Sequence, residues 1–503
     1  MQAWPYSLKH SLFRLVYSTL YQLNLDGTYS LDLADSVDVS SDGTVWTFKI
    51  RENAKFHDGA PITAKDVAFS LNLYKDTEGF PFLHGYTDHF AAIEAPDDAT
   101  VVITLDDAIP NMESQLFSLY ILPEHLWGEK TAQAAIDFTN DTMVGSGPFK
   151  LAEYRQNQFV RLDTNQDYYG SVPKVDGAIL QTYGNQDALV QALKTGEVDM
   201  ITEMPNTAVA ALRNDANIQL VVGAPLDPGV TDIIFNLVPP DQCPPDGKCT
   251  GHPALKDLTV RKALAHATDK QQLIDIVLLG LGTPGLTLIP DGLGVYYNNT
   301  LQDYAFDIAT ANKLLDDAGY KDVNGDGVRE TPDGKAPLSF RLNWAGDMSS
   351  GPRIAELLSK TWGEIGIKVE MQGLDPDTLT SVCCPAFDYD IIIWGWGSDP
   401  DPAFLLSVMT TDEIPTGTSE SGYSNPEYDE LFAQQAVETD KEKRKELIWE
   451  MQAIALRDLP YIIPYYGQNV QAFRKDRFQG WITDSSKIAL EDPSSLSLIE
   501  PVK

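Results

Sequence analysis

Long apolar runs are absent from this sequence. No stretch of about 18 consecutive apolar residues occurs, so no segment is expected to cross a membrane as a helix. A signal peptide is also missing, because residues 1–5 lead directly into sequence typical of a folded domain. We therefore expect either a cytoplasmic protein or an exported one whose signal has been replaced by a start methionine.

Basic residues are scarce. The chain has 37 Lys and Arg against 73 Asp and Glu, which gives a net charge of −36. A surface of this sign repels a phosphate backbone and argues against nucleic-acid binding. An acidic surface can also concentrate cations near a cleft, but its commoner effect is to keep a protein soluble.

Cysteine is rare, with four residues in two local pairs. Cys243 and Cys249 flank a turn-rich loop, where a small disulfide is expected. A zinc site that includes His252 is the alternative, but no second cysteine pair completes a four-ligand set. Adjacent Cys383 and Cys384 are expected to be unpaired, or paired in an unusual way, rather than structural.

The common catalytic motifs are missing as well. The patterns GxSxG, HExxH and GxxxxGKS/T do not occur. Residues 280–285 match GxGxxG, but a predicted helix precedes them where that motif requires a strand, so a helix cap and turn are expected. A secreted hydrolase with paired carboxylates stays an alternative, because acidic residues are too abundant to exclude it.

The length and composition indicate a folded protein of several domains. A chain of 503 residues exceeds what one core usually holds, so two or three domains are expected. Hydrophobic residues make up 43% and charged residues 22%, which is typical of globular proteins.

Strands and helices alternate along the chain. Residues 45–50 and 101–105 predict strands, and Thr63 is the expected N-cap of a helix. Later strands are expected at residues 198–201, 368–371 and 390–394, and later helices at residues 187–193, 258–279, 354–365 and 447–455. Arg261 and Lys262 are expected on the wet side of the long helix. This alternation favours an α/β fold with mostly parallel sheets.

Two stretches that contain Pro and Gly, residues 225–236 and 460–468, are expected to cross between lobes. Such crossings suit a domain built from segments that are not contiguous in the sequence.

Residues 322–333 resemble a calcium-binding loop, with a glycine at the sixth position. The ligands of a structural calcium would come from Asp322, Asn324, Asp326, Val328 and Asp333. An ordinary solvated hairpin loop is the alternative.

Residues 394–402 combine two tryptophans, two glycines and two carboxylates. A predicted buried strand runs into Gly395, and glycine lets backbone approach a ligand closely. Trp394 and Trp396 would form the walls of a site for an amine-bearing small molecule, with one of the two carboxylates as its fixed charge. The alternative is a strand-end turn whose tryptophans belong to the core.

Taken as a whole, the chain resembles family 5 of the bacterial extracellular solute-binding proteins, the peptide, dipeptide and nickel group that serves ABC importers. The similarity rests on six segments in the expected order: WTFKIR to KFHDGAPITAKDV (46–67), GSGPFKL (145–151), NQDYYG (165–170), GEVD (196–199), VRKAL (260–264) and YSNPEYD (423–429).

The resemblance implies a two-lobed periplasmic binding protein fold of type II, cluster C-like, with an extra domain inserted in the first lobe and a two-segment hinge. The expected bounds are 1–35, 166–228 and 469–503 for the first lobe (domain Ia), 36–165 for the inserted domain Ib, and 229–468 for the second lobe. It also implies a lost signal sequence and a location outside the cytoplasmic membrane, periplasmic or lipid-anchored.

The implied function is capture of a peptide by lobe closure and its delivery to a membrane permease, by a monomer that requires no cofactor. In peptide-binding members, an Asp that matches Asp399 grips the α-ammonium of the ligand. Trp396 would be a wall of the site, and backbone groups around Gly395 and Tyr423 would pair with the peptide main chain.

The sequence departs from the dipeptide binders in one respect. They hold the ligand carboxylate with an Arg before the helix that here starts near Arg353, and residues 342–352 contain no Arg. Arg353 or Arg341 would have to serve, so oligopeptides are expected rather than dipeptides. Oligosaccharides and a nickel chelate are alternative ligands, with His57 and His84 as metal candidates, and a signalling receptor is an alternative role.

Overall fold

The computed structural model describes residues 12–77, 83–156, 158–183, 185–202, 204–484 and 487–503. The chain forms two compact units, unit 1 (Met1–Leu226 and Asn469–Lys503) and unit 2 (Asp227–Gln468). It therefore passes from one unit to the other twice, once in each predicted crossing stretch. The finer division of the first lobe into domains Ia and Ib stays a prediction.

Unit 1 contains a four-stranded antiparallel sheet in the order β3-β4-β6-β5. Its strands are β3 (Ala34–Val39), β4 (Val45–Ile50), β5 (Phe90–Glu94) and β6 (Thr100–Leu105). Helix α2 (Ala64–Lys75) follows Thr63, whose backbone N–H and hydroxyl both donate to Asp66 Oδ2 at 2.9 Å. The predicted helix start is thereby confirmed.

The rest of unit 1 consists of small sheets and short helices. The sheets have the orders β1-β2, β7-β8-β9, β10-β18-β11-β20 and β19-β21. Their strands are β1 (Tyr21–Leu23), β2 (Tyr29–Leu31), β7 (Phe149–Arg155), β8 (Phe159–Thr164), β9 (Gly177–Gln181), β10 (Met200–Ile201), β11 (Ile218–Pro225), β18 (Asn469–Arg474), β19 (Phe478–Gln479), β20 (Lys487–Ile488) and β21 (Glu500–Pro501). The helices are α3 (Met112–Ser118), α4 (Glu124–Trp127), α5 (Ala132–Asp137), α6 (Gln186–Thr195), α7 (Asn206–Leu212) and α17 (Pro493–Leu496), with the 3₁₀ turn η1 (Gly85–Thr87).

Unit 2 is built around a six-stranded mixed sheet in the order β13-β17-β12-β16-β14-β15. The strands are β12 (Gly229–Phe235), β13 (Gly282–Pro284), β14 (Ser339–Ala345), β15 (Lys368–Leu374), β16 (Ile391–Gly397) and β17 (Tyr461–Gly467). Only β14 pairs in parallel, with β15 and β16; the other pairs are antiparallel. The prediction of mostly parallel sheets is therefore wrong, because the crossing strands β12 and β17 pair antiparallel at its centre.

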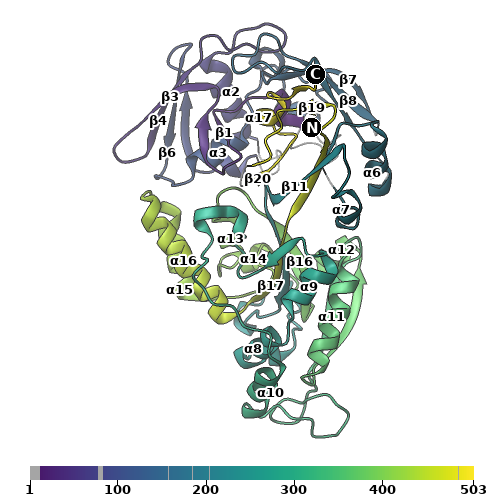
Figure 1. The fold of residues 1–503 in the computed structure, drawn as a ribbon. Helices are drawn as coiled ribbons and strands as arrows, with labels where there is room; N and C mark the ends of the chain where they lie inside the picture. The colour runs from purple at the N-terminus through teal and green to yellow at the C-terminus, as the bar shows by residue number, and fades with distance from the viewer. Residues whose placement is uncertain (1–11, 78–82, 157, 184, 203, 485–486) are drawn as a thin grey trace. The chain divides into compact units, whose positions relative to one another are not determined.

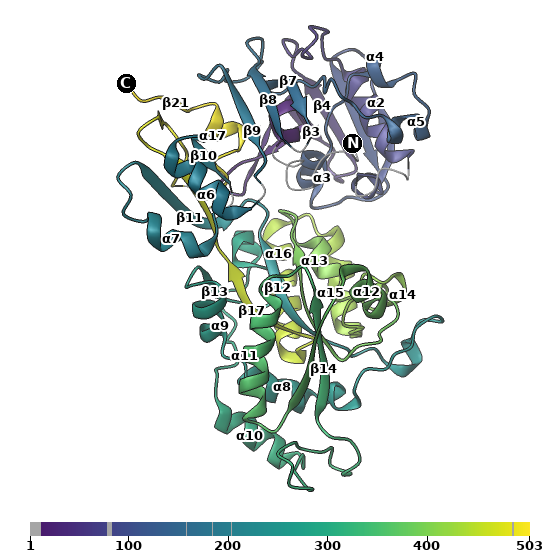
Figure 2. The ribbon, with the colours of Figure 1, turned by 90° about the vertical axis from the view of Figure 1, so that its right-hand side faces the viewer.

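Helices cover both faces of this sheet (Figures 1 and 2). On one face, Ile233 and Phe235 of β12 pack against α8 (Leu258–His266), α9 (Lys270–Val277), α10 (Ile308–Asp317) and α11 (Gly351–Gly363). On the other, Val230 and Ile234 pack against α12 (Pro376–Cys383), α13 (Ala403–Ser407), α14 (Glu413–Thr416), α15 (Pro426–Val437) and α16 (Lys441–Asp458). We call this second face the α16 face. The 3₁₀ turns are η2 (Pro240–Gln242), η3 (Pro253–Lys256) and η4 (Asp291–Tyr296).

The long helix predicted at residues 258–279 is in fact two helices, α8 and α9. Asp269 breaks it, because its side chain accepts a hydrogen bond from Gln272 N and caps the second helix. The wet position predicted for Arg261 is wrong as well. Its guanidinium is buried and donates to the carbonyls of Leu255 and Asp458, the latter at the C-terminal end of α16.

Both cysteine pairs are disulfides, Cys243–Cys249 and Cys383–Cys384. The small disulfide predicted in the first loop is confirmed, and neither of its thiols is left for zinc. The amides of Lys248 and Cys249 donate to Ala386 O, so the two disulfide-containing loops lie side by side.

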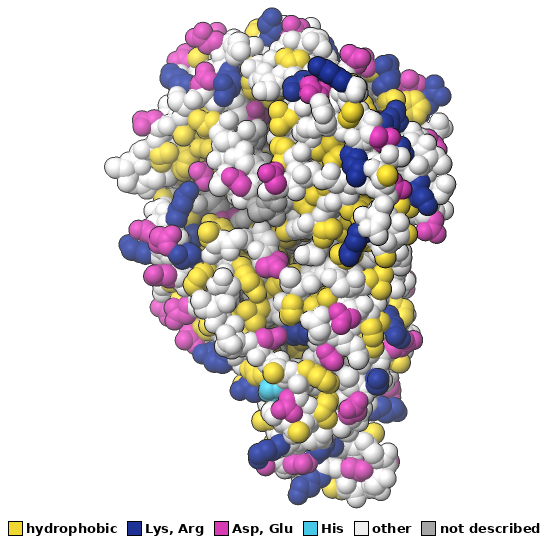
Figure 3. Space-filling model, viewed as in Figure 1, with side chains coloured by type: hydrophobic (Ala, Val, Ile, Leu, Met, Phe, Trp, Pro, Cys, Tyr) yellow, Lys and Arg dark blue, Asp and Glu magenta, His cyan; other side chains and the backbone are white. Residues whose placement is uncertain are grey.

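Among the described residues, the structure has no helix with the length and apolar character needed to cross a membrane. Acidic and basic side chains are interspersed on the face drawn in Figure 3.

Candidate functional site

The predicted ligand segment lies at the end of strand β16. Trp394 faces Asp232 across the β12–β16 pair, and Trp396 faces Val230. Directly opposed residues of an antiparallel pair share one side of the sheet, so both tryptophans lie on the α16 face. They are half-buried and pack against the core of that face, as the core interpretation predicted for them. Their role as walls of a ligand site stays a prediction.

Gly395 and Gly397 differ in their surroundings. A Cβ added to Gly395 would lie 2.3 Å from the Val230 carbonyl oxygen, whereas one added to Gly397 would meet nothing within 4 Å. The close approach that requires glycine at 395 is therefore made by the neighbouring strand β12. Gly397 is exposed and leaves the backbone accessible.

The indole of Trp396 is held by a buried acid. Its Nε1 donates to Glu420 Oε2 at 2.7 Å, and its ring meets Phe404 edge to face at a centroid distance of 5.4 Å. Glu420 comes from the segment between α14 and α15. The ring of Trp396, near the end of β16, is thus held by Glu420 and Phe404.

The two carboxylates of the segment have different roles. Asp401 is buried and forms an ion pair with Arg444 of α16, with Nη1–Oδ2 and Nη2–Oδ1 distances of 2.6 and 2.8 Å. Asp399 is half-buried, and Ser398 before it donates through its backbone N–H and its hydroxyl to Pro228 O. Asp401 therefore anchors the loop, while Asp399 is the carboxylate nearer to solvent.

Tyr423 is held by its own unit. Its phenol donates to Asp458 Oδ2 at 2.6 Å and accepts from Asn425 Nδ2 at 2.9 Å, and its backbone N–H donates to Ser421 Oγ at 3.2 Å. Burial raises the pKa of the phenol, and the bond to Asp458 raises it further. The phenol and the amide of Tyr423 are thus engaged within unit 2.

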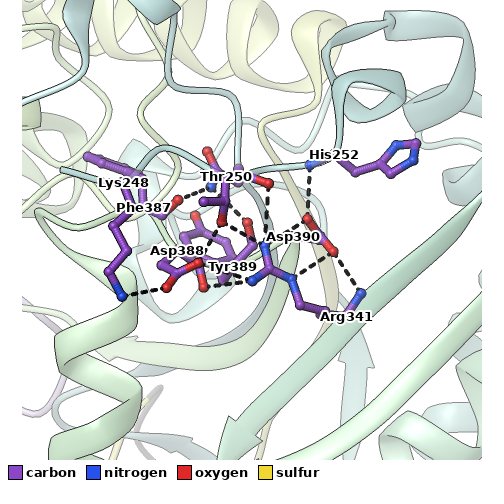
Figure 4. A network of polar contacts seen from close by, with 9 residues as sticks. Lys248, Thr250, His252, Arg341, Phe387, Asp388, Tyr389 and Asp390 are labelled. Carbon is purple, nitrogen blue, oxygen red and sulfur yellow. Dashed lines mark hydrogen bonds and ion pairs between the residues drawn. The ribbon is translucent and has the colours of Figure 1, made fainter. Parts of the chain in front are cut away.

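The structure brings neither predicted arginine to this segment. Arg353 lies in α11 and pairs with Glu356 of the same helix at 2.9 Å. Arg341 of β14 is fixed in a polar network drawn in Figure 4, where its Nε donates to Asp390 Oδ2 at 3.0 Å and its Nη1 to Asp388 Oδ1 at 3.2 Å.

The Arg341 network serves to hold a loop. Asp388 also accepts from Lys248 Nζ at 2.8 Å and from the Thr250 hydroxyl at 2.6 Å (Figure 4). Burial raises the pKa of Asp388, but the bonds from Lys248, Thr250 and Arg341 outweigh it and lower the pKa to about 2. The network therefore ties the loop around residue 250 to the start of β16.

The predicted calcium loop has a different set of neighbours from the one expected. Single carboxylate oxygens of Asp322, Asp326 and Glu330 lie within 4.8 Å of one another, whereas Asp333 bonds to Thr331 and Lys335. Asn324 donates to Glu330 Oε1 at 2.7 Å. Glu330, and not Asp333, is therefore the acid that lies with Asp322 and Asp326. The wider ligand set, with the carbonyl of Val328, stays a prediction.

The two histidines weighed as metal candidates bond to backbone. His57 Nε2 lies 3.1 Å from Gly147 O, and its Nδ1 accepts from Gly145 N at 3.3 Å. His84 Nδ1 lies 3.1 Å from Tyr74 O. For His57 this agrees with the predicted role in the hydrogen bonding of its turn.

Sequence reasoning missed a buried acidic pair, Asp232 and Glu420, beneath Trp394 and Trp396. Neither carboxylate oxygen of Asp232 accepts a hydrogen bond of ordinary length. Burial raises its pKa to about 8, although the backbone N–H groups of Trp394 and of Asp232 itself lower it in part. Burial also raises the pKa of Glu420 well above its usual value, and the charge of Asp232 adds to this. The one signal in the sequence that could have revealed this pair is the position of Asp232 inside the mainly apolar run 230–235.

Comparison with known proteins places these features in a family. Residues 28–416 match the model of the bacterial extracellular solute-binding proteins, family 5. The oligopeptide-binding protein AppA of Bacillus subtilis is 28% identical over 91% of this chain and 82% of its own length. The heme-binding protein A of Haemophilus influenzae is 27% identical over 86% and 77%.

Solved structures share the fold. The ABC transporter substrate-binding protein CtaP of Listeria monocytogenes superposes with a TM-score of 0.83 at 23% identity, over 99% of this chain and 96% of that one. The prediction of a two-lobed α/β binding-protein fold is thereby confirmed. The chain belongs to the bacterial extracellular solute-binding proteins, family 5.

Proposed function

We propose that this protein is the substrate-binding component of an ABC importer and that its ligand is a peptide. The observation that carries the proposal is the sequence similarity to the oligopeptide-binding protein AppA over nine-tenths of the chain. The heme-binding relative matches a smaller share of this chain at nearly the same identity. The protein works outside the cytoplasmic membrane, as a monomer that requires no cofactor, and delivers its ligand to membrane permease subunits.

Recognition in this proposal centres on the segment after β16. Asp399 accepts from the α-ammonium of the peptide, and Trp396 forms an aromatic wall beside it. Trp396 lies near the end of β16, and Asp399 lies in the loop that follows, which is anchored by Asp401 and Ser398. A preorganised loop of this kind binds a ligand without first losing the entropy of ordering itself.

Longer peptides suit this site better than dipeptides. Arg353 forms an exposed pair with Glu356, and Arg341 is bonded to Asp388 and Asp390, so each predicted arginine already has a carboxylate partner in unit 2. A dipeptide site needs a fixed partner at both ends of its ligand. An oligopeptide can leave its far end in solvent, and its affinity then comes from main-chain and side-chain contacts along its length.

No covalent chemistry is part of the proposed function. Capture by lobe closure requires only that the ligand bind the closed form better than the open one, and the ligand shifts the population by that difference in affinity. The alternative of a secreted hydrolase predicts that a bound peptide is cleaved.

The test combines native mass spectrometry with calorimetry. The protein as purified is examined for a retained ligand, and a library of free peptides of two to nine residues is then titrated. We expect peptide-sized masses, recovered intact, and tighter binding of the longer peptides. Failure of every peptide to bind, or recovery of cleaved peptide, would overturn the proposal.

A further inference from the structure

Two carboxylates of unit 2 are buried close together without a cation. Asp232 lies in the middle of β12 and has no exposed surface, and Glu420 is 5% exposed. Among the described residues, no Lys, Arg or His forms an ion pair with either of them. A buried carboxylate normally pairs with a cation or with several hydrogen-bond donors, so the negative charge of this acid pair is not balanced by any protein group that the structure describes.

The groups around the pair cannot neutralise two negative charges. Glu420 accepts from Trp396 Nε1, and the other titratable groups that interact with both acids are the phenols of Tyr389 and Tyr461. Tyr389 donates to the Glu420 carbonyl, and Tyr461 Oη is buried without a hydrogen-bond partner of ordinary length. All of these side chains are neutral, so they leave the pair needing either a proton or a bound cation.

The acid pair lies on the α16 face of the sheet, next to the proposed ligand segment. Asp232 is directly opposed to Trp394, and Trp396 lies two residues further along the same side of β16. Both tryptophans are half-buried, so the pair lies beneath the aromatic side chains that form the walls of the site.

We propose that Asp232 and Glu420 form a subsite for one ammonium or guanidinium group of the peptide ligand. The subsite rests on the proposed peptide-binding function and deepens it, because it assigns a preference for positively charged peptides. The cation reaches the acids when the Trp396 indole releases Glu420. It supplies N–H donors to the Asp232 oxygens, which have none of ordinary length in this structure.

A proton and the ligand cation compete for the same pair. Near neutral pH the empty pair holds a proton, in agreement with the raised pKa values of both carboxyls. Binding of the cation releases that proton, so the affinity for a cationic peptide rises with pH. A neutral peptide releases none.

The experiment compares matched peptides and matched variants. The peptides are a lysine-containing hexapeptide, its norleucine analogue, and the N-acetylated form of each. The variants are Asp232→Asn and Glu420→Gln, with Glu370→Gln as control, because Glu370 is an exposed acid on β15 of the same sheet. Calorimetry in buffers of different ionisation enthalpy gives both the affinity and the number of protons released.

For the wild-type protein we expect at least tenfold tighter binding of a charged peptide than of its neutral counterpart, with proton release at pH 7. Each of the two variants should reduce this ratio below threefold, and Glu370→Gln should retain it. Loss of the preference on norleucine substitution identifies the lysine side chain as the cation of the subsite. Acetylation should weaken binding to the wild type and to both variants alike, because the proposed function assigns the terminal ammonium to Asp399.

Equal affinity for charged and neutral peptides, or a preference that both variants retain, would overturn the subsite while leaving the peptide function intact. Failure of every peptide to bind overturns the peptide function itself. The pH dependence of wild-type affinity decides the case even if a variant does not fold.

Discussion

Asp401 and Arg444 form a two-pronged ion pair in the interior of unit 2. Their side chains are 8% and 2% exposed, and Gln435 Oε1 accepts a further bond from Arg444 Nη2 at 3.1 Å. The pair joins the loop after β16 to helix α16. Through it, the position of Asp399, two residues earlier, depends on the packing of a helix in the core.

Removing one partner of this pair should destabilise the protein strongly. Asp401→Asn leaves the Arg444 charge buried and without its counter-ion, a change that costs about 3–5 kcal/mol in comparable sites. Urea denaturation followed by circular dichroism measures it. Asp399→Asn is the control, and an equal loss of stability in both variants would refute the division of roles between the two acids.

Asp399→Asn should instead weaken ligand binding. The substitution removes one charge-assisted hydrogen bond to the peptide ammonium, worth about 1.5–3 kcal/mol, so calorimetry should show at least a tenfold loss of affinity. The melting temperature should stay close to that of the wild type. Unchanged peptide affinity would show that another group holds the ammonium.

The two glycines of β16 should respond differently to a methyl group. Gly395→Ala places a Cβ 2.3 Å from the Val230 carbonyl and forces β12 and β16 apart, so we expect a loss of at least about 2 kcal/mol. Gly397→Ala meets nothing within 4 Å and should change stability by less than about 1 kcal/mol. Thermal melts of the two variants side by side test this. Similar melting temperatures would contradict it.

His57 should make stability depend on pH in mildly acidic solution. Burial lowers its pKa to about 4, against the hydrogen bond to Gly147 O, which raises it. The folded state then binds fewer protons than the unfolded state between pH 6.5 and 4, so stability is lost as the pH falls through that window. A shift of this size corresponds to a loss of about 3 kcal/mol over the whole window.

Many carboxylates also titrate in this pH range. The contribution of His57 is therefore taken as the difference between the stability curves of the wild type and a His57 variant. Stability is measured from pH 7.5 to 4 for the wild type and for His57→Gln, whose amide can still donate to Gly147. The wild type should lose more stability over this interval. Parallel curves would show that His57 keeps an ordinary pKa.

The loop at residues 322–330 should be stabilised by calcium if the predicted site forms. Binding to the folded state alone adds about 2.7 kcal/mol at a calcium concentration one hundred times the Kd. The melting temperature should therefore rise with calcium and fall on chelation. Glu330→Gln should abolish the response and Asp333→Asn should preserve it, because Glu330 is the acid that lies with Asp322 and Asp326. No response in the wild type would favour the solvated loop.

Local signals in the sequence were reliable wherever one short segment determines its own structure. The alternating run 45–50 forms β4 with those bounds, and Gly196 ends helix α6 with a φ of +77°. The two-lobed fold was predicted only from the resemblance of several segments to a known family. Sheet direction could not be predicted locally, because whether β12 pairs parallel or antiparallel is decided by partners more than 150 residues away.

The candidate site was predictable in its location and less so in its details. The tryptophans and acids of residues 394–402 identify the segment, but nothing in the spacing of Asp399 and Asp401 shows which one meets Arg444. Arg341 looked available for a ligand and is engaged by Asp388 and Asp390, two residues whose proximity arises from the pairing of β14 with β16. Glu420 escaped notice because its partner Asp232 is distant in the sequence.

The double crossing of the chain also sets the order in which the protein can fold. Unit 2 is one continuous segment, and its first and last strands, β12 and β17, are paired neighbours, so it can fold as soon as it has been synthesised. Unit 1 cannot, because strand β18 lies between β10 and β11 and belongs to the last 35 residues, Asn469–Lys503. A nascent chain therefore keeps unit 1 incomplete until residues 469–503 have been made, and a truncation after β17 would remove both β18 and β20 from a sheet whose other two strands, β10 and β11, are already made.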